Sequence, residues 1–407
     1  MKQDITLSKI LLLFFVVYFS CNSFLLTIKY SAYATVLMVL VVIISILISK
    51  LKGCYGVSRN CMALMCICLI NVVLTAMFNG YMNAYMLLIL NMVLCVSFIH
   101  LYSRQEFYEI YIVVMKIFAI AAIIVGLINI LAPNILTVFK TYSYGESNSH
   151  LYIDAILSFQ ASKLLRINSI WGEPGMFSVF LIFALLLECF FVNRRIHVFN
   201  YVLFNIAILL TFSTNGLVCL LAVHFTVFFN NKRKGENEKI MLVFIVLIAA
   251  ALFSMSRIDW LRESLIGATS KLDSEDISFA GRLAPLLYNI QEGLRSPFFG
   301  HGIRGGIFFV DYPFYSGYLI CNTATTTLLF ASFGIAYAAI TVVLMWKFSK
   351  LSYTDSKVVK LLVFIIVIAN VNTQAVHLDQ IYYLLLFSVY MVDDVEPRID
   401  QRQECVK

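Results

Sequence analysis

Long runs of apolar residues dominate this chain and limit what it can fold into. A helix needs about 20 consecutive apolar residues to cross roughly 30 Å of hydrocarbon. Such runs occur at about 8–28, 31–49, 60–78, 82–101, 110–131, 175–192, 240–256, 323–346 and 358–375. Hydrophobic residues make up 61% of the chain and charged residues only 13%, against about 25% charged in soluble proteins. The sequence therefore predicts an all-α polytopic membrane protein, with residues 1–407 forming a single integral membrane domain.

Two less regular stretches complete the expected spans. Residues 198–229 are mostly apolar but are interrupted by the polar segment 211–216, which predicts two short helices joined by a polar turn. Residues 380–392 predict a short last span. The first apolar run is too long for the core of a signal peptide, so it is expected to be the first span. The total is about 12 transmembrane helices.

The distribution of Lys and Arg predicts the orientation, because cytoplasmic loops carry an excess of basic residues. With the N-terminus inside, these groups face the cytoplasm: Lys2, Lys9, Lys50, Lys52, Arg59, Arg104, Arg194, Arg195, Lys232, Arg233, Lys234, Lys239, Lys347, Lys350, Lys357, Arg398, Arg402 and Lys407. The short outer connections hold one basic residue, Lys29. Both termini are therefore expected in the cytoplasm. The net charge of +7 then reflects orientation, and no nucleic-acid partner is expected.

Two connections are much longer than the others, and both fall on the outer side. They are 133–174, of about 40 residues, and 257–322, of about 65 residues. Long loops between compact elements are usually functional. Any chemistry is therefore expected in these two outer loops, which share one side of the membrane and can meet in space.

Each long loop contains a predicted helix. In the first loop, Tyr152, Ile156 and Phe159 have helical spacing and predict a helical stretch. In the second loop, apolar residues at helical spacing after Ala280 predict a short amphipathic helix with Pro285 in its first turn. That helix is expected to lie along the bilayer surface. A glycine-rich turn follows it.

Four arginines of these loops are candidates for holding a phosphate group, because a guanidinium binds phosphate bidentately and stays charged. They are Arg166, Arg282, Arg295 and Arg304. Arg166 precedes the sixth span beside Trp171, which is expected to be an interfacial ring. The alternative for Arg166 is a side chain that snorkels to the interface. The alternative for the other three is ordinary solvation.

Glu173 and His301 are the candidates for proton transfer. Glu173 precedes Pro174 at the start of the sixth span, where a helix dipole favours an anion. It serves either as a capping carboxylate or as a group that orients or deprotonates a substrate. His301 lies between two glycines, and a group that titrates near neutrality suits proton transfer. The alternative is a mobile surface histidine.

No metal site is expected. Asp273, Glu275 and Asp276 form an acidic stretch in the second loop, but no glycine-pinned cage of oxygen ligands accompanies them. A solvated acidic loop explains them better. No cofactor is expected either.

Several of these segments resemble the Wzy-type O-antigen polymerases and the related O-antigen ligases. The segment Arg166 to Gly175, with Glu173-Pro174 opening a span, is similar to the first large periplasmic loop of that family. The pattern of Arg282, ten residues and then Gly293 resembles the arginine–glycine motif of polymerase loops. Ser296-Pro-Phe-Phe-Gly-His-Gly302 is similar to the family's Pro-x-x-Gly-x-Gly turn.

Two further segments resemble the same superfamily but depart from it in one residue each. Thr211-Phe-Ser-Thr-Asn-Gly216 is similar to the polar break between two short helices, with Asn215 where an arginine often stands. Asn322, ahead of a span that contains Phe333-Gly334-Ile335, resembles the stretch where ligases carry a His-Asn pair. Cys321 stands in place of that histidine, which counts against a ligase.

The resemblance implies a GT-C-like, metal-independent glycosyltransferase of the bacterial inner membrane. Such a polymerase transfers the growing chain from undecaprenyl pyrophosphate to a new lipid-linked repeat unit at the periplasmic face. The expected partners are undecaprenyl-pyrophosphate-linked oligosaccharides, membrane lipid and, as a further candidate, a chain-length regulator protein. In this scheme the arginines contact the diphosphate, and Glu173 or His301 deprotonates the acceptor hydroxyl.

Two rival functions stay open. An O-antigen ligase would transfer the finished chain to the lipid A-core. A lipid-linked sugar flippase would suit twelve spans, but it should show polar residues through its spans and two related halves. The sequence shows no internal repeat, and apart from Lys116 the predicted spans are nearly uncharged.

Overall fold

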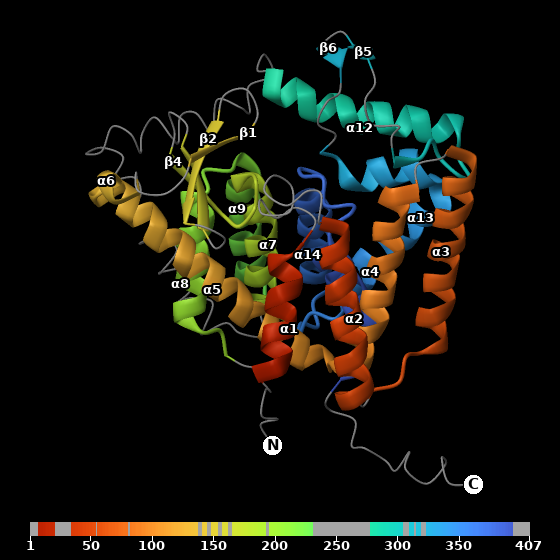
Figure 1. The fold of residues 1–407 in the computed structure, drawn as a ribbon, viewed down its shortest axis with the longest axis horizontal. Coiled ribbons are helices and arrows are strands. Elements are labelled where there is room, and N and C mark those ends of the chain that lie inside the picture. The colour runs from red at the N-terminus through yellow and green to blue at the C-terminus, as the bar shows by residue number, and fades with distance from the viewer. Residues whose placement is uncertain are drawn as a thin grey trace.

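The computed structural model describes most of the chain. The residues that it describes are 7–20, 34–53, 55–79, 82–136, 141–144, 148–153, 157–161, 165–192, 195–230, 277–303, 309–312, 315–318 and 323–393. Helices form most of this part of the chain and run side by side in a bundle, with one helix crossing an end of it (Figure 1).

Four of the described helices are long and apolar enough to cross a membrane by length and composition. They are α3 (Arg59–Asn79), α5 (Arg104–Leu131), α7 (Pro174–Leu186) continued by the π-helix η3 (Leu187–Phe191), and α13 (Thr325–Lys350). Helices that satisfy their backbone hydrogen bonds internally are suited to a bilayer, and α13 departs from this pattern at Gly334, where its backbone is not helical.

Seven further helices complete the described part of the bundle. They are α1 (Leu7–Tyr18), α2 (Ala34–Lys52), α4 (Met82–Leu101), α8 (Val198–Leu210), α9 (Thr214–Phe228), α14 (Lys357–Val371) and α15 (Gln380–Phe387), which ends in the 3-10 turn η6 (Ser388–Tyr390). A short helix, α6 (Pro133–Leu136), follows α5.

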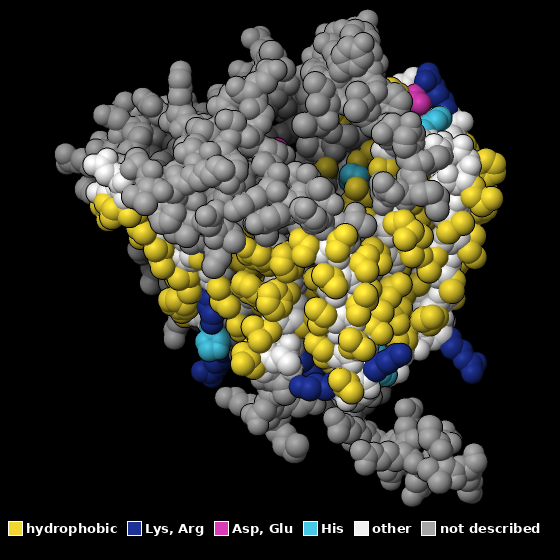
Figure 2. Space-filling view, viewed as in Figure 1, with side chains coloured by type: hydrophobic (Ala, Val, Ile, Leu, Met, Phe, Trp, Pro, Cys, Tyr) yellow, Lys and Arg dark blue, Asp and Glu magenta, His cyan; other side chains and the backbone are white. Residues whose placement is uncertain are grey.

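The prediction of a helical membrane protein is therefore supported at a coarse level. Eleven of the twelve predicted spans contain a described helix, and the stretch 240–256 lies outside the described residues. The predicted polar turn within 198–229 is confirmed, since α8 and α9 meet there. Figure 2 shows a broad band of hydrophobic side chains across this face of the bundle, bordered below by Lys and Arg, which is compatible with a lipid environment.

Helix α7 occupies the centre of the bundle. Every residue of α7 and η3 is buried, and the helix packs against α5, α8, α9 and α14. Trp171 precedes it and is fully buried, stacked on Phe177 and Phe180 with ring centroids 5.0 and 5.3 Å away. The expectation of an interfacial Trp171 ring was wrong, because protein side chains cover the ring completely.

Basic residues gather at one end of the bundle, which we call the basic end and define by Lys9, Lys52, Arg104 and Lys347. Lys9 pairs with the buried Glu106 at 2.7 Å, and Lys52 donates to Ser8 at 3.0 Å. Lys347 donates to the Tyr390 hydroxyl at 3.0 Å. These contacts bring the start of α1, the end of α2, the start of α5 and the ends of α13 and η6 to one side.

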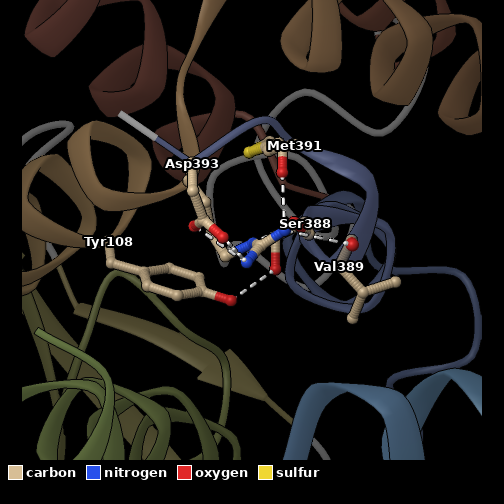
Figure 3. A network of polar contacts seen from close by, with 6 residues as sticks. Tyr108, Ser388, Val389, Met391 and Asp393 are labelled. Atoms are coloured by element: carbon tan, nitrogen blue, oxygen red, sulfur yellow. Dashed lines mark hydrogen bonds and ion pairs between the residues drawn. The ribbon is translucent and has the colours of Figure 1, made fainter. Parts of the chain in front are cut away.

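Arg104 ties the last described residues to this end (Figure 3). Its Nη1 donates to both carboxylate oxygens of Asp393, at 2.8 and 2.7 Å, and its Nη2 donates to the Met391 carbonyl at 2.7 Å. Tyr108 adds a hydrogen bond of 3.0 Å between its hydroxyl and that of Ser388. Residues 7 and 393 therefore lie on the same side of the bundle, as expected for termini that share a compartment.

The opposite end, which we call the loop end, carries the strands and α12 (Figure 1). A four-stranded antiparallel sheet has the order β1 (Thr141–Tyr144), β2 (Asn148–Ile153), β3 (Leu157–Ala161) and β4 (Leu165–Ser169). A two-stranded sheet consists of β5 (Phe309–Tyr312) and β6 (Tyr315–Tyr318). The fold is therefore not purely α-helical.

The predicted helix of the first long loop was wrong. Tyr152 lies in β2 opposite Ser158, and Phe159 lies in β3 opposite Leu151. Apolar residues three and four positions apart fit a helix, but in a short run they also fit two strands joined by a turn. Ile156 lies outside the described residues.

The predicted helix of the second long loop is confirmed. Helix α12 (Ile277–Arg295) has 19 residues and packs mainly on α13. Pro285 lies inside the helix rather than in its first turn, because α12 begins earlier than expected. The helix runs across the loop end of α3, α4 and α13 (Figure 1), the arrangement expected for a helix along a membrane surface.

Candidate functional site

Helix α13 is interrupted where it contacts the glycine turn. We define the glycine turn as residues 296–303, directly after α12. Gly334 has φ 80° and ψ −177°, so α13 is interrupted there. The Ile335 N–H then donates to the Pro297 carbonyl at 2.7 Å instead of to its own helix. The His301 N–H likewise donates to the Ala331 carbonyl at 2.8 Å. The glycine turn is thus hydrogen-bonded to the backbone of α13 on both sides of the interruption.

Two glycines are required by this close approach. Gly300 has φ 62°, and a Cβ built on it would lie 2.3 Å from the Ser332 carbonyl carbon. A Cβ on Gly334 would lie 2.4 Å from the Phe298 carbonyl oxygen. Any side chain at either position would push the glycine turn away from α13.

Helices α3 and α4 hold the other face of the glycine turn. Thr75 Oγ1 donates to the Phe299 carbonyl at 3.0 Å, and Asn71 Nδ2 donates to the Phe298 carbonyl at 3.4 Å. The Tyr85 hydroxyl accepts a hydrogen bond of 3.3 Å from the Ile303 N–H. Three spans therefore fix the backbone around His301.

His301 faces a carboxylate that the sequence analysis did not single out. Its Nε2 lies 3.1 Å from the Glu292 carbonyl oxygen and 3.4 Å from Glu292 Oε2. Arg295 Nη1 lies 2.5 Å from Glu292 Oε1. The Glu292 side chain is 8% exposed, against 36% for His301 and 61% for Arg295. A buried carboxylate thus contacts both a guanidinium and a partly exposed imidazole.

Glu292 could have been found from its spacing. It stands three residues before Arg295, which is the spacing of an ion pair on one helix face. Its contact with His301 could not have been found this way, because that contact depends on how the glycine turn folds back. This carboxylate also gives a counterion to Arg295, which was expected to contact a diphosphate.

Arg166 lies at the loop end, but it faces the protein. Its Nε donates to the Thr211 carbonyl at 3.0 Å, and the side chain is partly exposed. Thr211 is the C-cap of α8, and Phe212 follows with φ 44°. A cation is favourable at a helix C-terminus, so Arg166 stabilises the break between α8 and α9.

Glu173 is exposed and is the N-cap residue of α7, where its side chain makes no capping hydrogen bond. The expected position at the start of the sixth span is confirmed. Gly175 follows in the first turn, and a Cβ on it would lie 2.2 Å from Gln374 Nε2. The start of α7 is thus packed against the chain that leaves α14.

Threonines at the start of α13 contact both α12 and the chain that follows α14. Thr327 Oγ1 accepts from Asn289 of α12 at 3.2 Å. Thr325 Oγ1 donates to the Gln374 carbonyl at 2.6 Å. Gln374 in turn lies against the first turn of α7, beside Glu173. The first turn of α13 therefore bridges the helix that carries Glu292 and the chain that packs beside Glu173.

The connection between α14 and α15 contains buried polar residues. It is one of the short connections that were expected on the outer side. Asn91 lies near the middle of α4, and its Nδ2 donates to the Leu378 carbonyl at 3.0 Å. Asp379 is fully buried and caps α15 through the Ile381 N–H at 2.9 Å. Irregular backbone at this depth is stable only when protein surrounds it or a cavity admits water.

Other predicted residues are placed as follows. Arg282 lies in α12, but its side chain is outside the described part of the chain, and so is all of Arg304. The acidic residues Asp273, Glu275 and Asp276 also lie outside it. Asn215 Nδ2 donates to Asn370 Oδ1 at 3.2 Å, so these two amides join α9 to α14.

The described residues contain no group of three or more His, Cys, Asp or Glu side chains that could hold a metal ion. The loop end instead offers one imidazole, two carboxylates and two arginines whose surroundings are described. Such groups are able to accept a proton and to stabilise negative charge.

The fold and this site define a mostly helical protein with a membrane-compatible apolar belt and a polar loop end. A comparison with models of known protein families finds no match. A comparison with curated proteins finds none either. What this chain does is therefore argued from its own residues.

Proposed function

We propose that this protein is an O-antigen-type polysaccharide polymerase of a bacterial inner membrane. It transfers the growing undecaprenyl-pyrophosphate-linked chain onto a new lipid-linked repeat unit at the periplasmic face. The observation that carries the proposal is the cluster of His301, Glu292 and Arg295, which lies at the loop end, opposite the basic end.

The chemistry of such a transfer fits the groups available. The donor is a diphosphate at a lipid surface, and diphosphate is a good leaving group that needs little protonation. Catalysis then requires positive charge beside the diphosphate and a base for one acceptor hydroxyl. In this proposal Arg166, Arg282, Arg295 and Arg304 supply the charge, and Glu173 or His301 accepts the proton. No metal ion takes part.

The proposal includes a twelve-span, GT-C-like topology with both termini in the cytoplasm. The basic end supports this orientation, because Lys and Arg mark the cytoplasmic side of a membrane protein. Helix α12 then lies in the outer interface, where a lipid-borne substrate presents its diphosphate. Exposed apolar side chains on α12 and the glycine turn, such as Leu294 and Phe298, support contact with lipid.

A lipid-linked sugar flippase is the second candidate, because a specific observation favours it. Polar groups are buried inside α8 and α9, where the Tyr201 hydroxyl and Asn205 Oδ1 both contact the ring of His224, the latter at 2.8 Å. Intramembrane polar residues often line transport pathways. An O-antigen ligase stays the nearest alternative enzyme.

A deletion strain distinguishes the three functions on a polysaccharide gel. Loss of the ladder with a single-repeat band retained indicates the polymerase. Complete absence of capped core indicates the ligase. Accumulation of lipid-linked units on the cytoplasmic leaflet indicates the flippase, and it would refute the polymerase.

A charge reversal tests the second loop within the same proposal. Arg282→Glu should abolish long chains while the protein stays in the membrane at normal abundance, because a carboxylate repels a diphosphate. Arg59→Glu is the matched control, since Arg59 is an exposed residue at the first position of α3. Unchanged chain length in Arg282→Glu would remove Arg282 from the site.

A further inference from the structure

We propose that Glu292 is a positioning residue for His301, and that His301 rather than Glu173 takes the proton from the acceptor hydroxyl. The inference rests on the proposed function and specifies its base. Glu292 touches no reacting atom in this scheme and acts through the imidazole.

The contacts of His301 determine which of its nitrogens is the base. Nε2 faces the carbonyl oxygen of Glu292 at 3.1 Å and its Oε2 at 3.4 Å. Both oxygens accept hydrogen bonds, so Nε2 carries the hydrogen of the neutral ring. Nδ1 then holds the free electron pair, and it is the atom able to remove a proton.

The carboxylate of Glu292 is itself held in place. Arg295 binds its Oε1 at 2.5 Å, while Oε2 faces the imidazole. The side chain is nearly buried, so the orientation of the carboxylate is restricted and its negative charge is poorly screened by water. A carboxylate held in this way orients the histidine and stabilises the imidazolium that forms when the proton arrives.

The backbone of His301 is fixed as firmly as its ring. The flanking glycines, Gly300 and Gly302, have φ of 62° and 77°, and the N–H groups of His301 and Gly302 donate to carbonyl oxygens of α13. The fixed backbone therefore restricts the orientation of the His301 side chain. Its side chain remains 36% exposed, so a substrate can reach the imidazole.

Glu173 lacks a comparable setting. It is exposed at the N-terminus of α7, and no described partner is shown to orient its carboxylate. The positive end of a helix favours a carboxylate anion, as in a structural helix cap. Glu173 is better suited to bind a hydroxyl group of the sugar than to deprotonate one.

The transfer step balances with these groups. The acceptor oxygen forms a bond to the anomeric carbon of the donor as its proton moves to Nδ1 of His301. The bond between that carbon and the diphosphate oxygen breaks, and the electron pair leaves with the diphosphate. The imidazolium, stabilised by Glu292, later releases its proton to water.

A double-mutant cycle on the full-length protein tests the inference. Wild type, Glu292→Gln, His301→Ala and the double variant are reconstituted into phosphatidylglycerol–phosphatidylethanolamine vesicles. The probe is the lipid-linked repeat unit extracted from a strain that lacks this protein, and elongation is followed by gel. Glu109→Gln is the control, because Glu109 binds Gln105 at the basic end.

The single variants should differ in size of effect, and the double variant should be no worse than the histidine variant. We expect His301→Ala to slow elongation by about 100-fold, which is the lower limit of the usual range for a general base. Glu292→Gln, which removes a positioning group, should slow elongation by about tenfold. If Glu292 acts through His301, the double variant also loses about 100-fold. A loss of about 1000-fold in the double variant, or wild-type activity in either single variant, would overturn the inference.

The split between kcat and KM gives a readout that a general structural role would not separate. In this scheme Glu292 acts only on the proton-transfer step through His301, so Glu292→Gln should lower kcat for elongation and leave KM for the lipid-linked unit unchanged. A raised KM with an unchanged kcat would contradict the positioning role.

Two outcomes keep the inference separate from the proposed function. If wild-type protein fails to elongate the lipid-linked probe, the polymerase proposal fails, whatever Glu292 does. If Glu292→Gln does not elute as a monodisperse protein, Glu292→Asp replaces it, since it keeps the charge but withdraws the carboxylate by one methylene. The same non-additivity with His301→Ala is then expected, and additive losses would refute it.

Discussion

Arg166 donates from Nε to the carbonyl oxygen of Thr211 at 3.0 Å, so an arginine of the first long loop caps the C-terminus of α8. The contact spans 45 residues of sequence and joins the strand β4 to the break between α8 and α9. A residue chosen for phosphate binding thus has a structural role as well.

The capping role predicts a loss of stability when the guanidinium is removed. Arg166→Gln should lower the free energy of unfolding by about 1–3 kcal/mol, because a hydrogen bond from a charged donor is lost and a helix end is left without its cation. Thermal unfolding in detergent measures the change. Arg59→Gln, at an exposed position, should leave the midpoint unchanged, and equal midpoints for all three proteins would contradict the cap.

The break in α13 predicts a strong dependence on the glycine at its centre. Gly334→Ala should lower stability by about 2 kcal/mol or more, because its backbone conformation suits glycine and the new Cβ would meet the Phe298 carbonyl. Gly56→Ala is the matched control, since nothing lies within 4 Å of a Cβ there. The melting temperatures of Gly334→Ala and Gly56→Ala, measured in detergent, test this prediction. A Gly334→Ala midpoint equal to the control would show that the turn is not seated on α13.

Arg104 should matter more than the carboxylate with which it pairs. Asp393→Asn removes a partly exposed ion pair and should cost about 0.5–1 kcal/mol. Arg104→Ala also removes the side-chain donor to the carbonyl oxygens of Val389 and Met391, so it should cost about 2–4 kcal/mol (Figure 3). Detergent unfolding curves of both variants measure the difference. Equal losses would assign the whole effect to the ion pair.

The two ends of the bundle predict opposite results with topology reporters. Alkaline phosphatase needs its disulfides and is active only outside the cytoplasm. Fusions after Ser296 should therefore be active, and fusions after Gly56 or Tyr353 should be inactive. Fusions of green fluorescent protein at the same residues should give the reverse pattern. Phosphatase activity at Gly56 together with inactivity at Ser296 would invert the orientation and refute the proposed periplasmic site.

The sequence predicts the helices of the bundle well because a bilayer forces each apolar span to satisfy its own hydrogen bonds. It also places Glu173 correctly, since Glu-Pro ahead of an apolar run is a local signal for a helix start. The first long loop failed for a local reason as well. The spacing of Tyr152 and Phe159 is compatible with a helix, but the two residues lie on paired antiparallel strands.

The contacts that build the site are harder to foresee, because they join distant parts of the chain. Nothing near Gly334 in the sequence shows that the Pro297 carbonyl replaces its helical partner. Similarly, Glu292 resembles half of an ordinary surface ion pair until the glycine turn brings His301 back beside it. The buried position of Trp171 follows from the protein side chains that cover the ring, which no periodicity reveals.

The complete enclosure of α7 has a consequence for how the protein is made. Glu188, near the end of this helix, is fully buried and accepts hydrogen bonds from the His197 N–H at 2.7 Å and from Asn200 at 3.0 Å. Both donors are synthesised after it, and so are three of the helices that cover α7. The nascent segment is therefore complete before three of its neighbours exist, and its acidic group acquires the partners His197 and Asn200 only when the following segment is made.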